Sequence, residues 1–179
     1  MSDWPGRTDR WGVHTSAISP LSPLSLGSGF GAVHGSASPV SAAWPAANRA
    51  ILVPFRLPVI ATAYQMIVGC GATASGNFDA GIYDWYGNLL VSSGTTAKVS
   101  GAEVVLNITD TVLGPGRYYM AVSVDGAEGM TTWTMANAFT PKYFGVRQAT
   151  AAFVLPATVT LETVASGVVP SLVVLFKSQ

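Results

Sequence analysis

Histidine and cysteine, the residue types that most often do chemistry near neutral pH, are scarce in this sequence of 179 residues. The two histidines, His14 and His34, lie in an N-terminal stretch without helix or strand periodicity, and a third metal ligand is missing nearby. We therefore expect neither a catalytic triad nor a metal site there. Cys70 is the only cysteine, and the apolar run before it predicts a small core residue rather than a reactive thiol.

Paired carboxylates are the remaining source of acid–base chemistry, because two of them can hydrolyse a glycosidic bond. The candidates are Asp79, Asp84, Glu103 and Asp110. Asp84 and Asp110 lie beside turns, where aspartate usually accepts hydrogen bonds from backbone donors. Asp79 alternates with apolar neighbours, which predicts a place on the outer face of a strand. The sequence therefore favours a protein that is not an enzyme and that uses no cofactor.

Two adjacent aromatic residues, Trp85 and Tyr86, lie at the tip of a hairpin predicted around Asp84–Asn88. Aromatic faces stack on the apolar face of a pyranose ring, so this pair is a candidate glycan contact. Aromatic residues are also common in protein interfaces, because they combine a large area with a polar tip. Packing against a neighbouring subunit or a loop is the alternative.

We expect the chain to divide into two parts, an extended N-terminal arm over residues 1–44 and a β-sandwich domain over residues 45–179. Residues Thr15–Ala43 contain no Asp, Glu, Lys or Arg and are interrupted by Pro20, Pro23 and Pro39. Such a stretch has no apolar period that would form a helix or strand by itself.

Ordering an arm of this length costs about 1 kcal/mol per residue, so only an interface-sized burial of about 1,600 Å² offsets the cost. We expect a docking strap laid over neighbouring subunits, and the alternative is an arm that folds back over its own domain. Large apolar and guanidinium side chains are the usual anchors of an interface. In the arm the expected partner-binding residues are Trp4, Arg7, Arg10, Trp11, Leu21, Leu24, Leu26 and Phe30.

From Ala50 onward the chain consists of short β-rich runs separated by Gly, Pro, Asn and Asp, which predicts an all-β domain. The spacing favours a jelly-roll-like antiparallel β-sandwich. Successive side chains of the predicted strand Asn77–Asp84 point to opposite sides. One side carries Phe78, Ala80 and Ile82, and the other carries Asp79, Gly81 and Tyr83, so we expect one core face and one outer face. The predicted strands are Ile51–Phe55, Thr62–Val68, Asn77–Asp84, Leu89–Ser93, Ala102–Ile108, Arg117–Val124, Thr131–Met135, Ala151–Leu155, Thr158–Glu162 and Ser171–Lys177.

The charge pattern restricts the classes of partner. Charged residues make up 10% of the chain, against about 25% in an ordinary globular protein, and the formal net charge is zero. No basic stripe exists to neutralise phosphates, so we expect no nucleic-acid partner. The beginning of the chain lacks the pattern of a signal peptide, and prolines divide the apolar tail into strand-length pieces, so we expect no membrane partner. A surface so poor in charge favours assembly with other subunits.

Four segments resemble a β-sandwich module that recurs in structural proteins of tailed bacteriophages. They are Ser75–Asp84, Gly87–Gly94, Asn107–Asp110 and Leu113–Ala121, within a region from about Ala46 to Asp125 that covers under half of the chain. These are turn and strand signatures, so the resemblance carries no catalytic residue.

The resemblance implies a virion protein, which could decorate the capsid, form a head fibre or belong to the tail. The arm favours a capsid decoration or cement protein that staples neighbouring subunits. Its implied partners are the major capsid protein or other virion subunits, with self-association on the particle. The implied location is the virion, most often the capsid surface, after synthesis in the host cytoplasm. The alternative is a tail or fibre module that binds host carbohydrate through Trp85 and Tyr86.

Overall fold

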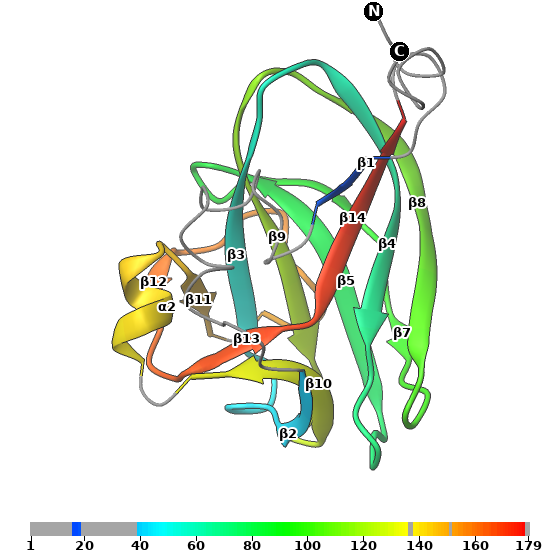
Figure 1. The fold of residues 1–179 in the computed structure, drawn as a ribbon, viewed down its shortest axis with the longest axis vertical. Helices are drawn as coiled ribbons and strands as arrows, with labels where there is room; N and C mark the ends of the chain where they lie inside the picture. The colour runs from blue at the N-terminus through cyan, green and yellow to red at the C-terminus, as the bar shows by residue number, and fades with distance from the viewer. Residues whose placement is uncertain (1–15, 19–38, 136–137, 151, 178–179) are drawn as a thin grey trace, which may run out of the picture.

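The computed structural model describes residues 16–18, 39–135, 138–150 and 152–177. In these ranges the chain is almost entirely β, as predicted (Figure 1). The early strands are β1 (Ser16–Ile18), β2 (Val40–Ala43), β3 (Ala50–Leu57), β4 (Ala61–Gly69), β5 (Asn77–Asp84), β6 (Leu89–Ser92) and β7 (Thr96–Ala97). They are followed by β8 (Glu103–Leu113), β9 (Gly116–Val124), β10 (Gly129–Thr134), the short helix α2 (Phe139–Tyr143), β11 (Arg147–Ala149), β12 (Glu162–Thr163), β13 (Val168–Pro170) and β14 (Leu172–Lys177).

The strands form antiparallel sheets packed as a sandwich. One sheet has the order β1-β14-β4-β8, and the larger seven-stranded sheet has the order β12-β11-β3-β9-β5-β6, with β7 also paired to β5. A third sheet, β13-β10-β2, adjoins them at the lower end of the molecule in Figure 1. The connections β3–β4, β4–β5 and β8–β9 each pass from one large sheet to the other, which is the jelly-roll-like feature of the fold.

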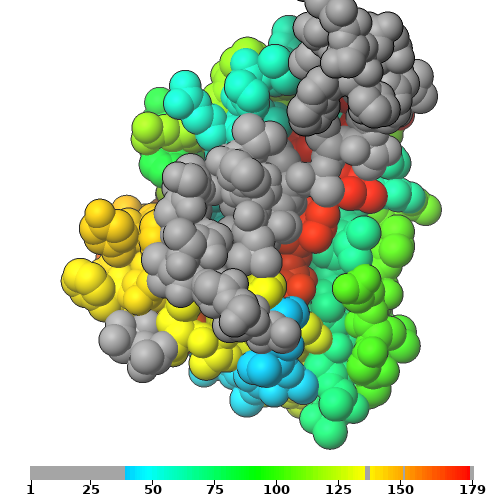
Figure 2. Space-filling model, in the orientation of Figure 1, coloured from blue at the N-terminus to red at the C-terminus, as the bar shows by residue number. Residues whose placement is uncertain are grey.

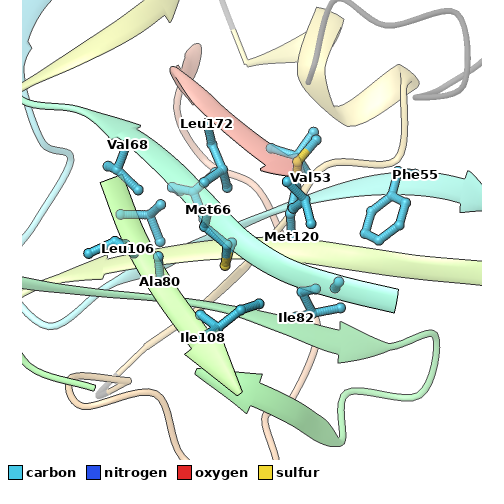
Figure 3. Packing of buried hydrophobic residues seen from close by; sticks show 14 of the residues in the cluster. Val53, Phe55, Met66, Val68, Ala80, Ile82, Leu106, Ile108, Met120 and Leu172 are labelled. Atoms are coloured by element: carbon cyan, nitrogen blue, oxygen red, sulfur yellow. The ribbon is translucent and has the colours of Figure 1, made fainter. Parts of the chain in front are cut away.

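The main core lies between the two large sheets. Figure 3 shows side chains from β3, β4, β5, β8, β9 and β14 meeting there, and the residues labelled are buried. They are Val53, Phe55, Met66, Val68, Ala80, Ile82, Leu106, Ile108, Met120 and Leu172. On β5 these residues alternate with side chains of the opposite face, as the sequence pattern predicted.

The opposite face of the seven-stranded sheet is buried as well, which corrects the expectation of one core face and one outer face. Leu52, Tyr83, Tyr119 and Ala121 form a second apolar cluster with Ala152 and Leu155. Residues 152–161, here called the covering segment, lie over this face. A Cβ at Gly81 would lie 2.6 Å from the Val91 carbonyl oxygen and 2.9 Å from the Leu155 side chain. The covering segment therefore turns a would-be solvent face into a second core.

Eight of the predicted strands are present and two are wrong. The ends of the eight shift by at most two residues, except that β8 continues to Leu113 where the prediction ended at Ile108. Ala151 lies outside the described residues, and residues 152–155 form no strand. Residues 159–161 form no strand either, and Thr158 makes only an isolated bridge to Asn88. These residues are apolar because they pack on the sheet from above, and not because they pair within it.

Two strands lie within the predicted arm. β2 pairs with β10, and the following Trp44 is 2% exposed and donates its indole N–H to the Arg49 carbonyl. Strand pairing of the sandwich thus begins upstream of the predicted boundary at residue 45. β1 pairs with β14 of the same chain, with Ala17 opposite Leu175. For these three residues the pairing favours the alternative in which the arm folds over its own domain.

Candidate functional site

The hairpin between β5 and β6 is built as the sequence predicted, and its turn is fixed by Asp84. One carboxylate oxygen accepts the backbone N–H groups of Tyr86 and Asn88 at 2.8 and 2.9 Å, and the other accepts the Asn88 side-chain amide at 2.7 Å. Slight desolvation opposes these hydrogen bonds, but together they lower the pKa of Asp84. Asp84 is therefore a structural cap of the turn.

The two aromatic residues of this turn have different environments. Trp85 is partly buried and stacks on Tyr119 of β9, with ring centroids 4.8 Å apart and an interplanar angle of 7°. Tyr86 is 84% exposed. The turn thus presents Tyr86 to solvent, whereas Trp85 packs against strand β9 of its own sheet, a contact that the sequence interpretation did not include.

Three arginines lie on the same face of the seven-stranded sheet as this aromatic stack. The Arg117 guanidinium carbon lies 5.4 Å from the centroid of the Trp85 ring. Arg56 of β3 lies directly opposite Arg117 of β9 in the strand pairing. Arg147 of β11 donates a hydrogen bond to Tyr119. Here Arg56, Arg117 and Arg147 are called the arginine cluster.

Sequence reasoning did not single out the arginine cluster. Arg117 and Tyr119 share a strand face by simple alternation, which the sequence could have shown. Arg56 and Arg147 join them only through strand pairing between distant segments. Burial raises the pKa of Tyr119, although the hydrogen bond from Arg147 and the positive charges of Arg147 and Arg117 act in the opposite direction.

Asp79 lies on the predicted face of β5, but it is 0% exposed instead of solvated. Its Oδ2 accepts the backbone N–H of Leu155 at 3.0 Å, and its Oδ1 accepts the Ser93 hydroxyl at 3.2 Å. Desolvation raises the pKa of Asp79, although these hydrogen bonds oppose the shift. Asp79 therefore ties the covering segment to the sheet.

The other candidates for acid–base chemistry have separate structural places. Asp110 forms an ion pair with Lys177, and Glu103 is exposed at the beginning of β8. Cys70 is buried, as predicted. In the part of the chain that the structure describes, no three His, Cys, Asp or Glu side chains gather as a metal site would require.

The predicted anchors of the arm are outside the described residues. They are Trp4, Arg7, Arg10, Trp11, Leu21, Leu24, Leu26 and Phe30, and both histidines also lie there. No helix among the described ranges is long and apolar enough to cross a membrane.

One end of the sandwich presents apolar side chains to solvent. Val59 and Ile60 of the β3–β4 connection are 58% and 54% exposed, and Val112 of β8 is 59% exposed. Thr62 of β4, two residues after Ile60, lies opposite Val112, so the end of the connection and this part of β8 lie side by side. Val59, Ile60 and Val112 are here called the apolar end. The β3–β4 connection lies at the upper end of the molecule, and β2 lies at the lower end (Figures 1 and 2).

Comparison of the chain with protein-family models, with curated proteins and with solved structures finds no match.

Proposed function

We propose that this chain is a non-enzymatic structural protein of a phage virion, and that it decorates the capsid as a cement protein. The observation that supports this proposal best is the apolar end. Residues 57–62 and 111–116 contain no charged side chain, and three large aliphatic residues are more than half exposed there. Single exposed aliphatic residues are ordinary, but an uncharged group of them is typical of a surface that contacts another protein.

The partners in this proposal are the major capsid protein or other virion subunits, with self-association on the particle. The apolar end would be buried against a capsid subunit, and the arm would supply the anchors named from the sequence. Burial and added strand pairing across a subunit boundary raise the free energy needed to separate the subunits. This gives a stapling role that needs no catalytic residue and no cofactor.

The apolar end gives a direct test with capsids purified without this protein. We expect Val59→Ser combined with Ile60→Ser to weaken capsid binding at least tenfold, because both side chains are exposed and their replacement leaves the core intact. The matched control is Val99→Ser with Val105→Ser, since these valines are 52% and 57% exposed outside the apolar end. Full occupancy of capsids by the first variant would refute this role.

Glycan binding in a tail or fibre is the second candidate, and the exposure of Tyr86 favours it. An aromatic ring that is 84% exposed at a turn fixed by Asp84 is available to stack on a sugar. We expect Tyr86→Ala to abolish binding on a glycan array. Tyr143→Ala is the control, because Tyr143 is 77% exposed on α2. Equal binding by the two variants would remove this candidate.

A further inference from the structure

The pairing of Arg56 with Arg117 places two positive charges directly opposite each other on neighbouring strands. Both residues are exposed. Like charges in this position destabilise a sheet by a few tenths of a kcal/mol or more. A chain in which only 10% of the residues are charged has no general need to place two arginines together, so a bound anion is a natural reason for the arrangement.

No carboxylate in the described ranges neutralises the arginine cluster. The ion pairs in the described ranges join Lys98 to Asp125 and Glu128, and Lys177 to Asp110. The acids that belong to neighbouring segments have other partners. Asp84 accepts hydrogen bonds within its turn, and Glu162 accepts them from Gln148 and Thr150.

Aromatic contacts hold two of the guanidinium groups in place. Arg117 lies over Trp85, Trp85 stacks on Tyr119, and Tyr119 accepts a hydrogen bond from Arg147. A long side chain normally loses rotamer freedom when it binds a ligand, and a side chain already fixed by stacking loses less. Two of the three arginines are thus preorganised for a small ligand.

We propose that the arginine cluster binds the anionic group of an acidic glycan, a sugar that carries a carboxylate, sulfate or phosphate. The guanidinium fork matches the geometry of such oxyanions. Three arginines on one sheet face, two of them directly opposite each other, suit a single anionic group. A nucleic acid instead needs a basic groove along its backbone, and this chain has a formal net charge of zero. The exposed ring of Tyr86, next to Trp85, supplies a face for the sugar.

This inference rests on the second candidate function and names its ligand class. It is tested with the full chain on an array that carries carboxylated, sulfated, phosphorylated and neutral glycans, followed by titration with galacturonate trimer and its methyl ester. The ester keeps the sugar rings and removes the negative charges. Oligothymidylate and polyglutamate are titrated beside them to represent nucleic acid and acidic protein.

We expect binding to be confined to acidic glycans and to weaken at least tenfold in Arg56→Gln and in Arg117→Gln. Lys177→Gln is the matched control, because it removes one positive charge from the other large sheet. Unfolding curves of the three variants check that each is folded. An unchanged affinity in the folded arginine variants would overturn the inference.

The remaining outcomes separate this inference from the function on which it rests. Binding of neutral glycans that depends on Tyr86 but not on the arginines would overturn the acidic class and keep the glycan function. Absence of binding to every glycan would overturn both. Tighter binding of oligothymidylate or polyglutamate, lost in the arginine variants, would assign the cluster to a nucleic acid or to an acidic protein surface instead.

Discussion

The Asp79 carboxylate accepts the backbone N–H of Leu155 at 3.0 Å, and this contact joins a central strand to a segment far along the chain. The carboxylate is fully buried, and its second oxygen accepts the Ser93 hydroxyl. A buried acceptor of this kind helps to determine where the covering segment lies, because moving the segment would leave the Leu155 N–H without its acceptor and the carboxylate with only the Ser93 hydroxyl.

The pH dependence of stability should report on Asp79. Because burial raises its pKa in the folded state, the stability that Asp79 contributes is present below its unfolded pKa of about 4 and is lost as pH rises through the folded value. We expect Asp79→Asn to remove this loss. The unfolding free energy of the wild type minus that of the variant should therefore decrease as the pH rises from acidic to neutral. Urea unfolding at several pH values measures it, and parallel profiles would contradict the prediction.

Asp79→Ala is the matching truncation. It removes the charge but leaves the Leu155 N–H buried without its acceptor, so we expect a loss of about 1–3 kcal/mol relative to Asp79→Asn. The same urea series measures the difference. Equal stability of the two variants would show that the covering segment does not depend on this hydrogen bond.

Gly87 is expected to be the most sensitive residue of the β5–β6 turn. Its φ is +90°, and a Cβ there would lie 2.6 Å from the Val159 carbonyl oxygen. Gly101 has a φ of +68°, and a Cβ there would meet no atom within 4 Å, so Gly101→Ala isolates the backbone cost of about 1 kcal/mol. Gly87→Ala should lower the free energy of unfolding by clearly more. Equal losses of unfolding free energy in urea titrations would mean that the covering segment moves away from the new Cβ at little cost.

Neutralising one member of the arginine pair should not weaken the fold. We expect Arg56→Gln to leave stability unchanged or to raise it by roughly 0.2–1 kcal/mol at low salt, because it relieves repulsion with Arg117. The gain should shrink in high salt, where exposed charges are screened. Thermal unfolding at two salt concentrations measures both effects, and a large destabilisation would show that Arg56 has a structural partner.

Two deletions should distinguish the arm from the sandwich. Removal of residues 1–38 takes away β1 and keeps β2, so we expect a cooperatively folded protein. Removal of residues 1–44 also takes away β2 and the buried Trp44, which should lower the unfolding free energy by a further several kcal/mol, on the scale of losing a large core side chain. Denaturant unfolding of the two proteins measures the difference, and equal stability would place the domain boundary after Trp44.

Local sequence signals were enough to predict elements such as β5 and its hairpin. The alternation from Asn77 to Asp84 and the glycine at position 87 lie within one short stretch, and the structure has both. The covering segment was misassigned to strands because its apolar residues look the same whether they pair in a sheet or pack on top of one. Only the side chains beneath it, such as Tyr83 with its hydroxyl donating to the Pro156 carbonyl, distinguish the two cases.

The candidate site was predictable only in part for the same reason. Trp85 and Tyr86 are adjacent, so their shared turn could be read directly from the sequence. Arg56 reaches Arg117 through strand register, and register depends on which strands become neighbours in the folded sheet. Burial of Asp79 likewise depends on the covering segment.

The described ends of the chain share one corner of the sandwich. Ser16 lies opposite Phe176, and the next residue, Lys177, lies opposite Thr62, which in turn faces Val112 of the apolar end. A bulky group attached at Lys177 would therefore lie beside the apolar end. The turn at Ala127 and Glu128 is exposed and follows β9 at the far pole, so an insertion there would project away from any surface that the apolar end contacts. The fold thus places the apolar end and the 127–128 turn at opposite poles of the sandwich.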